Sequence, residues 1–332
     1  MSSPGPGLPA IGVDIGGTKV WAGVVDEVGE VLAEVHRDTP ERSTRPAVVE
    51  DVIVSAVHQV LLDARLTASE VVGVGVGAAG FVSADRGSVV FAPHLSWRYE
   101  PLRDRLSGRL GLPVTVDNDA NAAAWAEYRF GAGQGESRLL LVTLGTGIGG
   151  GLVIDGRVER GRYGMAGEFG HMIVVPDGRR CECGNRGCWE QYASGSVVLR
   201  EARELVRAGG PYAEELSRRC AGVPQTLDGP AVTAAGHAGD AAAREILAEV
   251  GRWLGLGLAN LVAALDPGII VVGGGVSMAD DLLLDPAREA LRRHLTGRGH
   301  RPVAPVRAAY LGARAGLIGA ADLARIEAGC TP

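Results

Sequence analysis

The sequence predicts an α/β protein made of two halves. Segments with helical spacing alternate with short β-prone runs along the chain, as is typical of α/β architecture. A unit of strand, glycine turn and strand occurs at residues 11–35 and again at residues 139–161. Two copies of one unit within 332 residues indicate an internal duplication. We therefore expect each half to hold one copy and to face a shared cleft.

The composition supports this size of fold and excludes some classes of function. Hydrophobic residues make up 46% and charged residues 22%, enough apolar material for sizeable cores. The formal charge of −6 argues against a general nucleic-acid binder, which needs a basic face. No run approaches the roughly 20 apolar residues of a membrane span. Residues 1–10 lack the features of a secretory signal, so we expect a loose tail and a cytoplasmic protein.

The elements of the first half follow from local patterns. After the three strands of residues 11–35, apolar residues recur with helical spacing over residues 45–64. Strands are expected at residues 71–76 and 113–116. The alanine-rich stretch at residues 118–130 predicts a helix that ends at Gly131.

The second half continues the alternation after its own glycine hairpin, in which Asp155-Gly156 forms the turn to a further strand. Helices are expected at residues 197–208, 240–265, 285–295 and 313–327, and strands at residues 269–272 and 303–309.

Two glycine patterns imitate a dinucleotide-binding fingerprint. They are Gly75-Gly77-Gly80 and Gly145-Gly147-Gly150. That fingerprint requires a helix directly after the glycines. Here Gly150 leads into a strand and hairpin, and the segment after Gly80 is not helical either. The pattern therefore does not indicate NAD binding, and no P-loop motif is present.

The hairpin turns themselves, at residues 14–19 and 145–150, remain candidates for binding phosphate. Glycine turns expose backbone N–H groups, and each turn carries a threonine hydroxyl. One glycine-rich hairpin can be merely a turn. Two copies, one of them with Asp14 at the strand end, favour a triphosphate ligand.

Three cysteines and one histidine predict a metal site. Cys181, Cys183 and Cys188 follow His171, and an odd number of clustered cysteines suits metal binding better than disulfides. Buried hydrophobic cysteines are the weaker alternative because the residues between them are polar. Three thiolates and an imidazole form a closed tetrahedral zinc site, hence a structural one. Cys220 and Cys330 stand alone and are expected to be structural.

Together the segments DIGGTK, NDANAAA, LGTGIGGG, GEFGH and CxCGxxGCxE resemble the ROK family of sugar kinases, and bacterial ATP-dependent glucokinases in particular. The resemblance extends from Ile11 to about Ala328. It implies an actin-like, ribonuclease-H-like fold whose two lobes close on ATP and a hexose. The implied reaction is the phosphorylation of glucose at its 6-hydroxyl by ATP. The implied lobes are residues 11–117, completed by a C-terminal helix at 313–328, and residues 118–312, which carry a zinc loop at 171–188.

The resemblance also assigns site residues. It implies that Asp119 is the catalytic base, in the first turn of a helix capped by Asn118; a helix N-terminus should keep this acid ionised and weakly basic at pH 7. The alternative role, capping, suits Asp117 better. Sugar contacts are implied for Gly80, Asn118, Asp119, Glu168, His171 and Glu190.

Asp14 is expected to hold the water shell of Mg²⁺, although it could simply cap its turn. The implied contacts to ATP and Mg²⁺ are Asp14, Gly16, Gly17, Thr18, Lys19, Thr146, Gly147, Gly274 and Gly275. Lys19 is equally typical of a solvated strand end. The remaining histidines (His36, His58, His94, His237, His294 and His300) show no such constellation and are expected to be surface or core residues.

Several alternatives remain open at this point. Kinases of N-acetylglucosamine, N-acetylmannosamine, mannose or fructose use the same motifs, and polyphosphate could replace ATP. A sugar-responsive repressor would need an added helix-turn-helix, for which ten residues before the first strand leave no room. A non-catalytic sugar sensor stays possible. The resemblance further implies a homodimer or homotetramer.

Overall fold

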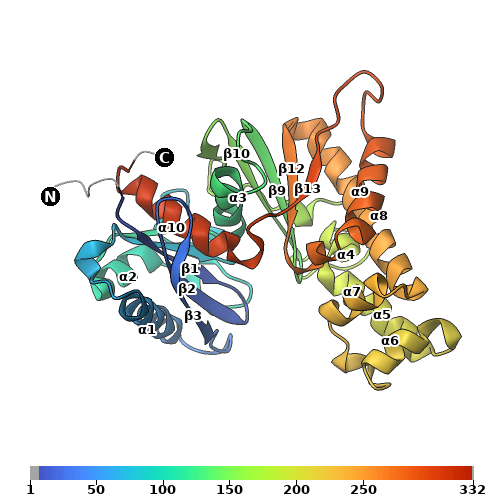
Figure 1. The fold of residues 1–332 in the computed structure, drawn as a ribbon, viewed down its shortest axis with the longest axis horizontal. Helices are drawn as coiled ribbons and strands as arrows, with labels where there is room; N and C mark the ends of the chain where they lie inside the picture. Colours follow the sequence, from blue (N-terminus) through green and yellow to red (C-terminus); the bar gives the residue numbers. More distant parts are fainter. Residues whose placement is uncertain (1–6, 331–332) are drawn as a thin grey trace. The chain divides into compact units, whose positions relative to one another are not determined.

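The computed structural model describes residues 7–330, which form two compact units (Figure 1). The first unit consists of the described chain up to Ser137, the segment Gly151–Gly167 and the segment from Tyr310 onward. The second unit consists of Arg138–Gly150 and Glu168–Ala309. Residues 1–6 of the expected tail lie outside the described residues, whereas its last residue, Ala10, begins the first strand.

The first unit is built on a five-stranded sheet with the order β3-β2-β1-β4-β8. Strands β1 (Ala10–Ile15), β2 (Lys19–Val25) and β3 (Val31–Asp38) form the predicted antiparallel hairpins. Strands β4 (Val74–Ala78) and β8 (Val114–Asn118) continue the sheet parallel to β1. The carboxyl ends of β1, β4 and β8 therefore meet at one edge of the sheet, where ligands bind in open α/β sheets.

The two faces of this sheet pack against different helices because side chains alternate along a strand. Ile11, Val13 and Ile15 of β1 point into a core shared with helix α1 (Pro46–Ala64). The intervening face packs on helix α10 (Ala315–Glu327), which lies along β1 (Figure 1).

Helix α10 packs so closely against the sheet and against helix α3 (Asp119–Phe130) that their backbones are in contact at glycine positions. A Cβ atom at Gly12 would lie 2.0 Å from the carbonyl oxygen of Leu317, and one at Gly75 would lie 1.7 Å from that of Ala320. A Cβ atom at Gly319 would likewise lie 1.7 Å from the carbonyl oxygen of Ala122. Only glycine permits such contacts, so these positions fix the distance between the helices and the sheet.

A small antiparallel sheet completes the first unit. It consists of β5 (Phe81–Val82), β6 (Val89–Phe91) and β7 (Arg98–Glu100). Helix α2 (Leu102–Leu110) follows it and packs against β8. The sequence patterns predicted neither this sheet nor helix α2, because the strands are only two or three residues long and α2 is mostly polar.

The second five-stranded sheet repeats the order of the first, as β11-β10-β9-β12-β13. Its strands are β9 (Arg138–Leu144), β10 (Ile148–Ile154), β11 (Arg157–Val158), β12 (Ile269–Gly273) and β13 (Val306–Ala308). The repeated order confirms the predicted duplication. The turn between β10 and β11 is the predicted hairpin, since Asp155 and Gly156 both have positive φ angles of 47° and 74°.

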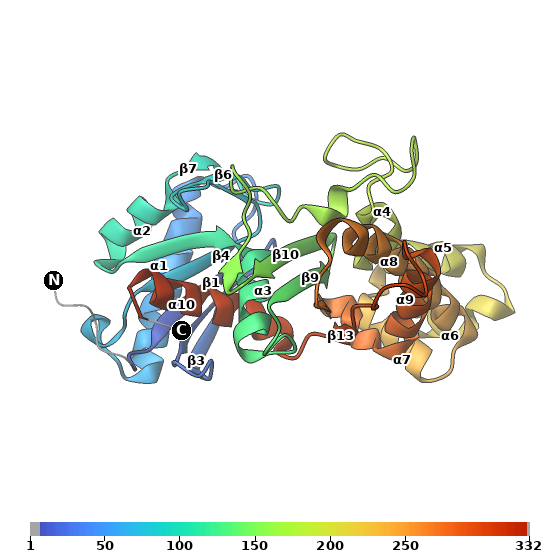
Figure 2. The same ribbon diagram turned by 90° about the horizontal axis from the view of Figure 1, so that it is seen from above.

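The helices of the second unit surround α8 (Ala241–Leu265), which packs against α9 (Asp281–His294), α7 (Gly229–His237) and α5 (Gly195–Ala208) (Figure 2). Short helices α4 (Glu190–Ala193) and α6 (Glu214–Arg219) complete it.

Helix α8 alone among the described helices is long and apolar enough to cross a membrane, but 56% of its most apolar window is buried inside the protein. Its apolar residues, such as Leu247, Leu254 and Leu258, are fully buried. We therefore interpret α8 as the core helix of this unit.

Most of the predicted helices agree with the structure to within two residues, whereas helices α4, α6 and α7 were not predicted. Other predictions differ from the structure. Helix α9 begins at Asp281, four residues before the predicted start, and therefore contains Pro286 in its interior, where proline removes one helical hydrogen bond. Strand β13 has only three residues. Helix α3 belongs to the first unit and not to the second lobe as drawn from the sequence, because it packs against α10.

Candidate active site

The junction between β8 and α3 carries two of the predicted site residues. Asn118 caps α3 as predicted, since its Oδ1 accepts hydrogen bonds from the N–H groups of Ala120 (2.9 Å) and Asn121 (3.1 Å). Its Nδ2 donates to the carbonyl oxygen of Gly80 (3.2 Å). The structure thus brings Gly80, Asn118 and Asp119 together at the carboxyl edge of the first sheet.

Asp119 begins helix α3, and its Oδ1 accepts a hydrogen bond from the N–H of Ala120 (2.9 Å). Burial nevertheless raises the pKa of Asp119, and the hydrogen bonds from the helix start offset this only in part. The expectation that the helix start makes Asp119 only weakly basic is therefore wrong. The desolvation of this carboxylate outweighs the helix N-terminus, and a raised pKa makes Asp119 a stronger base than an ordinary aspartate.

Asp14 lies beside Asp119 at the same edge. A Cβ atom at Gly77 would lie 3.8 Å from Oδ1 of Asp14 and 3.5 Å from Cα of Asp119. Burial, and secondly the charge of Asp119, raise the pKa of Asp14 to about 7. The carboxylate also lies against the first turn of α10, where a Cβ atom at Gly316 would come within 2.7 Å of Oδ2. Two neighbouring acids with raised pKa values form a favourable place for a cation.

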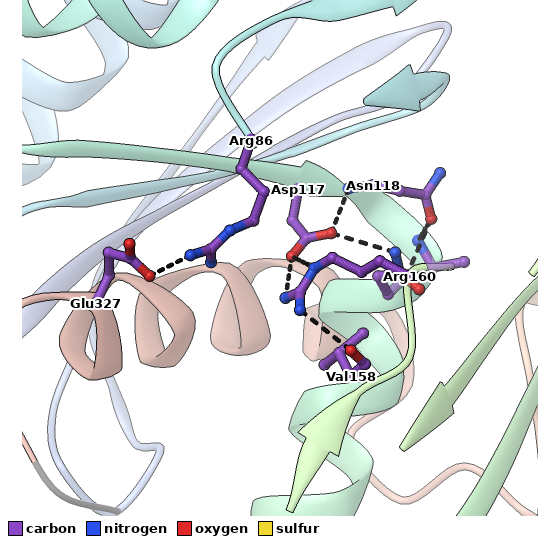
Figure 3. Close-up of polar contacts among 8 residues, drawn as sticks. Arg86, Asp117, Asn118, Val158, Arg160 and Glu327 are labelled. Atoms are coloured by element: carbon purple, nitrogen blue, oxygen red, sulfur yellow. Dashed lines mark hydrogen bonds and ion pairs between the residues drawn. The ribbon is translucent and has the colours of Figure 1, made fainter. Parts of the chain in front are cut away.

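Asp117 performs a different task from the capping considered above. Its buried carboxylate accepts hydrogen bonds from the N–H of Asn118 (2.9 Å) and from Nδ2 of Asn121 (3.2 Å). Its other oxygen accepts from Nε of Arg160 (2.8 Å) and also from Nη2 of the same guanidinium (Figure 3). Asp117 therefore ties the strand–helix junction to the segment after β11. No local sequence pattern indicates the role of Arg160, whose partner lies 43 residues earlier.

A second ion pair holds the small sheet of the first unit. Arg86, at the turn between β5 and β6, pairs with Glu327 at the end of α10 (Figure 3). This contact fixes the hairpin that follows Gly80.

The first glycine turn presents its residues to solvent. The N–H of Gly16 donates to the carbonyl oxygen of Lys19 (2.9 Å), and Gly17, Thr18 and Lys19 are exposed. Thr39 anchors the turn, because its Oγ1 donates to the carbonyl oxygen of Gly16 (2.9 Å). The predicted phosphate-binding turn is thus exposed to solvent, and Thr39 anchors its backbone.

The second glycine turn has a similar form within the second unit. The N–H of Gly145 donates to the carbonyl oxygen of Gly147 (3.0 Å), and the N–H of Gly195 donates to that of Gly145 (2.8 Å). The turn after β12 lies beside it, since a Cβ atom at Gly274 would lie 2.4 Å from the carbonyl oxygen of Leu144. Ser196 donates through Oγ to the carbonyl oxygen of Thr146 (2.7 Å). The predicted residues Thr146, Gly147, Gly274 and Gly275 therefore belong to one packed group of turns.

The four predicted metal ligands converge in the second unit. One ligand atom from each of four residues lies within 4.8 Å of the others; they are His171, Cys181, Cys183 and Cys188. Sγ of Cys181 is 3.6 Å from Nδ1 of His171, and the sulfurs of Cys183 and Cys188 are 3.6 Å apart. Ligands of one tetrahedral zinc ion would lie about 3.6 Å (N to S) and about 3.8 Å (S to S) apart. Side-chain geometry therefore suits a tetrahedral ion.

The pKa shifts of two of the thiols also favour a bound cation. Burial raises the pKa of the Cys181 and Cys188 thiols, so a cation is needed to hold them as thiolates. The loop is also shaped by glycine: at Gly187 the φ angle is 81°, and a Cβ atom there would lie 1.7 Å from the carbonyl oxygen of Val175.

Two carboxylates adjoin the cluster. Oε1 of Glu190 lies 3.0 Å from Sγ of Cys181, and its Oε2 faces Gly147, where a Cβ atom would lie 2.4 Å away. Nε2 of His171 lies 3.9 Å from Oε2 of Glu168. His171 thus directs one ring nitrogen toward the sulfurs and the other toward Glu168. The second unit brings its three predicted sugar contacts, Glu168, His171 and Glu190, around one imidazole.

One residue set aside in the sequence lies at the first site. The ring of His94 lies against Gly17, where a Cβ atom would come within 3.2 Å of its Cγ. The expectation of an ordinary surface residue rested on the missing motif around it, since only the fold brings His94 to the glycine turn.

Comparison with known proteins agrees with this arrangement. The model of the ROK family matches residues 10–327. A glucokinase of Streptomyces coelicolor is 49% identical over 95% of this chain and 97% of its own length. The crystal structure of a ROK family glucokinase from Streptomyces griseus, in complex with glucose and AMPPNP, is 48% identical, with a TM-score of 0.88 over 96% of this chain and 99% of that one. A xylose repressor of Caldicellulosiruptor bescii is 30% identical over 85% of this chain and 70% of the repressor.

Proposed function

The chain belongs to the ROK family, and from this premise we propose that it is a glucokinase, which transfers the γ-phosphoryl group of ATP to the 6-hydroxyl of glucose. Its fold is the two-lobed, actin-like fold of ROK sugar kinases. The observation within this chain that carries the proposal is the meeting of an exposed glycine turn with two half-buried acids, Asp14 and Asp119, at one sheet edge.

Asp119 is proposed as the base that accepts the proton of the 6-hydroxyl. A base acts best when its pKa lies near the working pH, and burial moves the pKa of Asp119 in that direction. Asn118 and the pair of Asp117 with Arg160 hold the helix start, and so fix the direction of the carboxylate.

The proposed sugar contacts are Gly80, Asn118 and Asp119 of the first unit, and Glu168, His171 and Glu190 of the second. Carboxylates, an amide and an imidazole suit vicinal hydroxyl groups, which donate and accept hydrogen bonds in pairs.

The proposed nucleotide contacts are the two glycine turns. They comprise Gly16, Gly17, Thr18 and Lys19 in the first unit and Thr146, Gly147, Gly274 and Gly275 in the second. Mg²⁺ bound with ATP would neutralise charge on the phosphates. Asp14 suits it, because Mg²⁺ prefers oxygen ligands and a cation offsets the repulsion between Asp14 and Asp119; Asp14 would hold its water shell.

We also propose that His171, Cys181, Cys183 and Cys188 hold a zinc ion. Four protein ligands leave no open position, so the ion would be structural and would fix the loop that carries the sugar contacts. All five cysteines are free, which fits a reducing cytoplasm. A homodimer or homotetramer is proposed from the family alone.

A panel of sugars and donors tests the function. Turnover is measured for glucose, mannose, fructose, N-acetylglucosamine and N-acetylmannosamine, each with ATP and with polyphosphate. We expect the highest kcat/KM for glucose with ATP. A higher value for another sugar or donor would contradict the assignment, and the absence of turnover with all of them would favour a sugar sensor.

A further inference from the structure

His94 projects from a loop that the first unit holds firmly. The loop joins β6 and β7, and Leu95 and Trp97 within it are buried. The guanidinium of Arg98 donates through Nη1 to three carbonyl oxygens of the loop, those of Ala92 (3.1 Å), Leu95 (3.3 Å) and Trp97 (2.6 Å). The backbone around His94 is therefore fixed, while its imidazole stays exposed.

Three parts of the proposed site surround this loop. The imidazole lies against the first glycine turn at Gly17, with the 3.2 Å approach given above. Phe91, the last residue before the loop, lies against Gly80, where a Cβ atom would lie 2.4 Å from the carbonyl oxygen of Phe91. Burial raises the pKa of Asp119, and a smaller opposing effect on this pKa comes from His94, so the ring lies within electrostatic reach of that acid.

The ring contacts the glycine turn and lies within electrostatic reach of Asp119, so a group that moves from the turn toward Asp119 would pass near it. If the turn binds phosphates and Asp119 meets the acceptor hydroxyl, the phosphoryl group passes between them. Phosphoryl transfer spreads negative charge over three equatorial oxygens, and a fixed donor in that position stabilises the charge.

We propose that His94 is a further catalytic residue, whose imidazole N–H donates a hydrogen bond to the phosphoryl group in transit and to the 6-phosphate of the product. The inference rests on the proposed function, because it takes glucose 6-phosphate as the product. In this proposal the β6–β7 loop contributes a residue to the active site, in addition to the residues at the strand ends such as Asp14 and Asp119.

The test compares His94→Ala and His94→Gln with the wild type. Calorimetry gives Kd for glucose and for glucose 6-phosphate, and steady-state kinetics give kcat and KM. For His94→Ala we expect kcat to fall about 100-fold, Kd for glucose 6-phosphate to rise about tenfold, and Kd for glucose to stay within twofold. His94→Gln keeps an N–H donor and should recover part of kcat. His58→Ala, another exposed histidine of the first unit, is the matched control and should match the wild type.

The outcomes separate the two proposals. Equal weakening of glucose and glucose 6-phosphate binding by His94→Ala would make His94 a sugar contact and overturn the inference, as would an unchanged kcat. Thermal melts exclude misfolding, since an exposed side chain should leave Tm within about 2 °C. A wild type that does not phosphorylate glucose would contradict the proposed function itself, and the inference with it.

Discussion

Two acids at one edge of the first sheet, Asp14 on β1 and Asp119 directly after β8, should govern how the activity and stability of this protein respond to pH. Burial raises the pKa of both Asp14 and Asp119, and the charge of Asp119 raises that of Asp14 further. A base must be ionised to accept a proton, so activity should fall as the pH drops through the raised pKa of Asp119. At the scale of single residues, desolvation therefore outweighs the helix N-terminus.

Replacing Asp119 with Asn tests the role of the base. The amide keeps the shape of the side chain but accepts no proton, so kcat should fall by about 10³-fold, a typical loss for general base catalysis. Binding of glucose, measured by calorimetry, should stay within about tenfold. A variant with near-normal turnover would remove Asp119 from the mechanism.

Replacing Asp14 with Asn tests the pKa shift through stability. The folded protein keeps the Asp14 proton up to about pH 7, whereas an unperturbed aspartate releases it near 3.8. Between these values the folded state binds more protons than the unfolded state, so the free energy of unfolding decreases as pH rises. The variant should therefore lose less stability than the wild type between pH 5 and pH 8, by about 1 kcal/mol after allowance for partial exposure.

Urea unfolding without ligands at both pH values measures this difference. Asp104→Asn, at an exposed position of α2, serves as the control and should follow the wild type. Identical pH dependence in the wild type and Asp14→Asn would show that Asp14 is ionised normally.

Among the elements, α10 has the closest packing in the first unit. Glycines on β1, β4 and α10 itself allow backbone contact with the sheet and with α3. Because these carbonyls belong to helices and cannot move independently, a methyl group at any of these positions must displace a whole element.

Gly319→Ala should therefore destabilise the protein by about 3 kcal/mol, the upper range for overpacking. Chemical denaturation provides the measurement. Gly108→Ala on α2 is the matched control, since nothing lies within 4 Å of its added methyl group, and it should stabilise the protein by about 0.5–1 kcal/mol. Similar stability of the two variants would contradict the close packing of α10.

The loop at residues 171–188 has little regular structure, and its ligand geometry suggests that a metal holds it. Cys183→Ser should reduce bound zinc, measured by elemental analysis, from about one ion per chain to nearly none, because a hydroxyl is a poor zinc ligand. Turnover should fall with it, since Glu168, His171 and Glu190 adjoin the loop. Cys330 lies outside the cluster, so the control variant Cys330→Ser should retain both the bound zinc and the activity. Full zinc content in Cys183→Ser would contradict the ligand set.

For the whole molecule, the first unit depends on a segment from the far end of the chain. Buried Glu127 of α3 accepts hydrogen bonds from the N–H groups of Tyr310 (3.1 Å) and Leu311 (2.8 Å), which lead into α10. Asp322 of α10 is buried as well and accepts from Nε1 of Trp125 (2.8 Å). The N-terminal sheet and α3 are therefore incomplete until the last helix has been made.

A chain that ends at residue 309 should not fold its first unit. We expect it to be insoluble or to lose the cooperative thermal transition seen by circular dichroism, because one face of the first sheet would be uncovered. A chain that ends at residue 328 retains α10 and should fold and remain active. A folded and active chain ending at residue 309 would show that α10 is dispensable.

The sequence by itself determined the features that depend on neighbouring residues. The repeated strand–turn–strand unit, the capping of α3 by Asn118 and the cluster of His171 with three cysteines are each encoded within a short segment, so spacing and residue type suffice to predict them. The resemblance to the ROK family rests on the same local motifs.

Tertiary structure alone decided the properties that depend on packing between distant segments. Two contacts join residues that no local pattern relates: the pairing of Asp117 with Arg160 and the contact of His94 with Gly17. The raised pKa of Asp119 likewise depends on the fold. The pKa illustrates the physical reason: the helix start acts locally and is visible in the sequence, whereas desolvation comes from everything packed around the carboxylate and exists only in the fold.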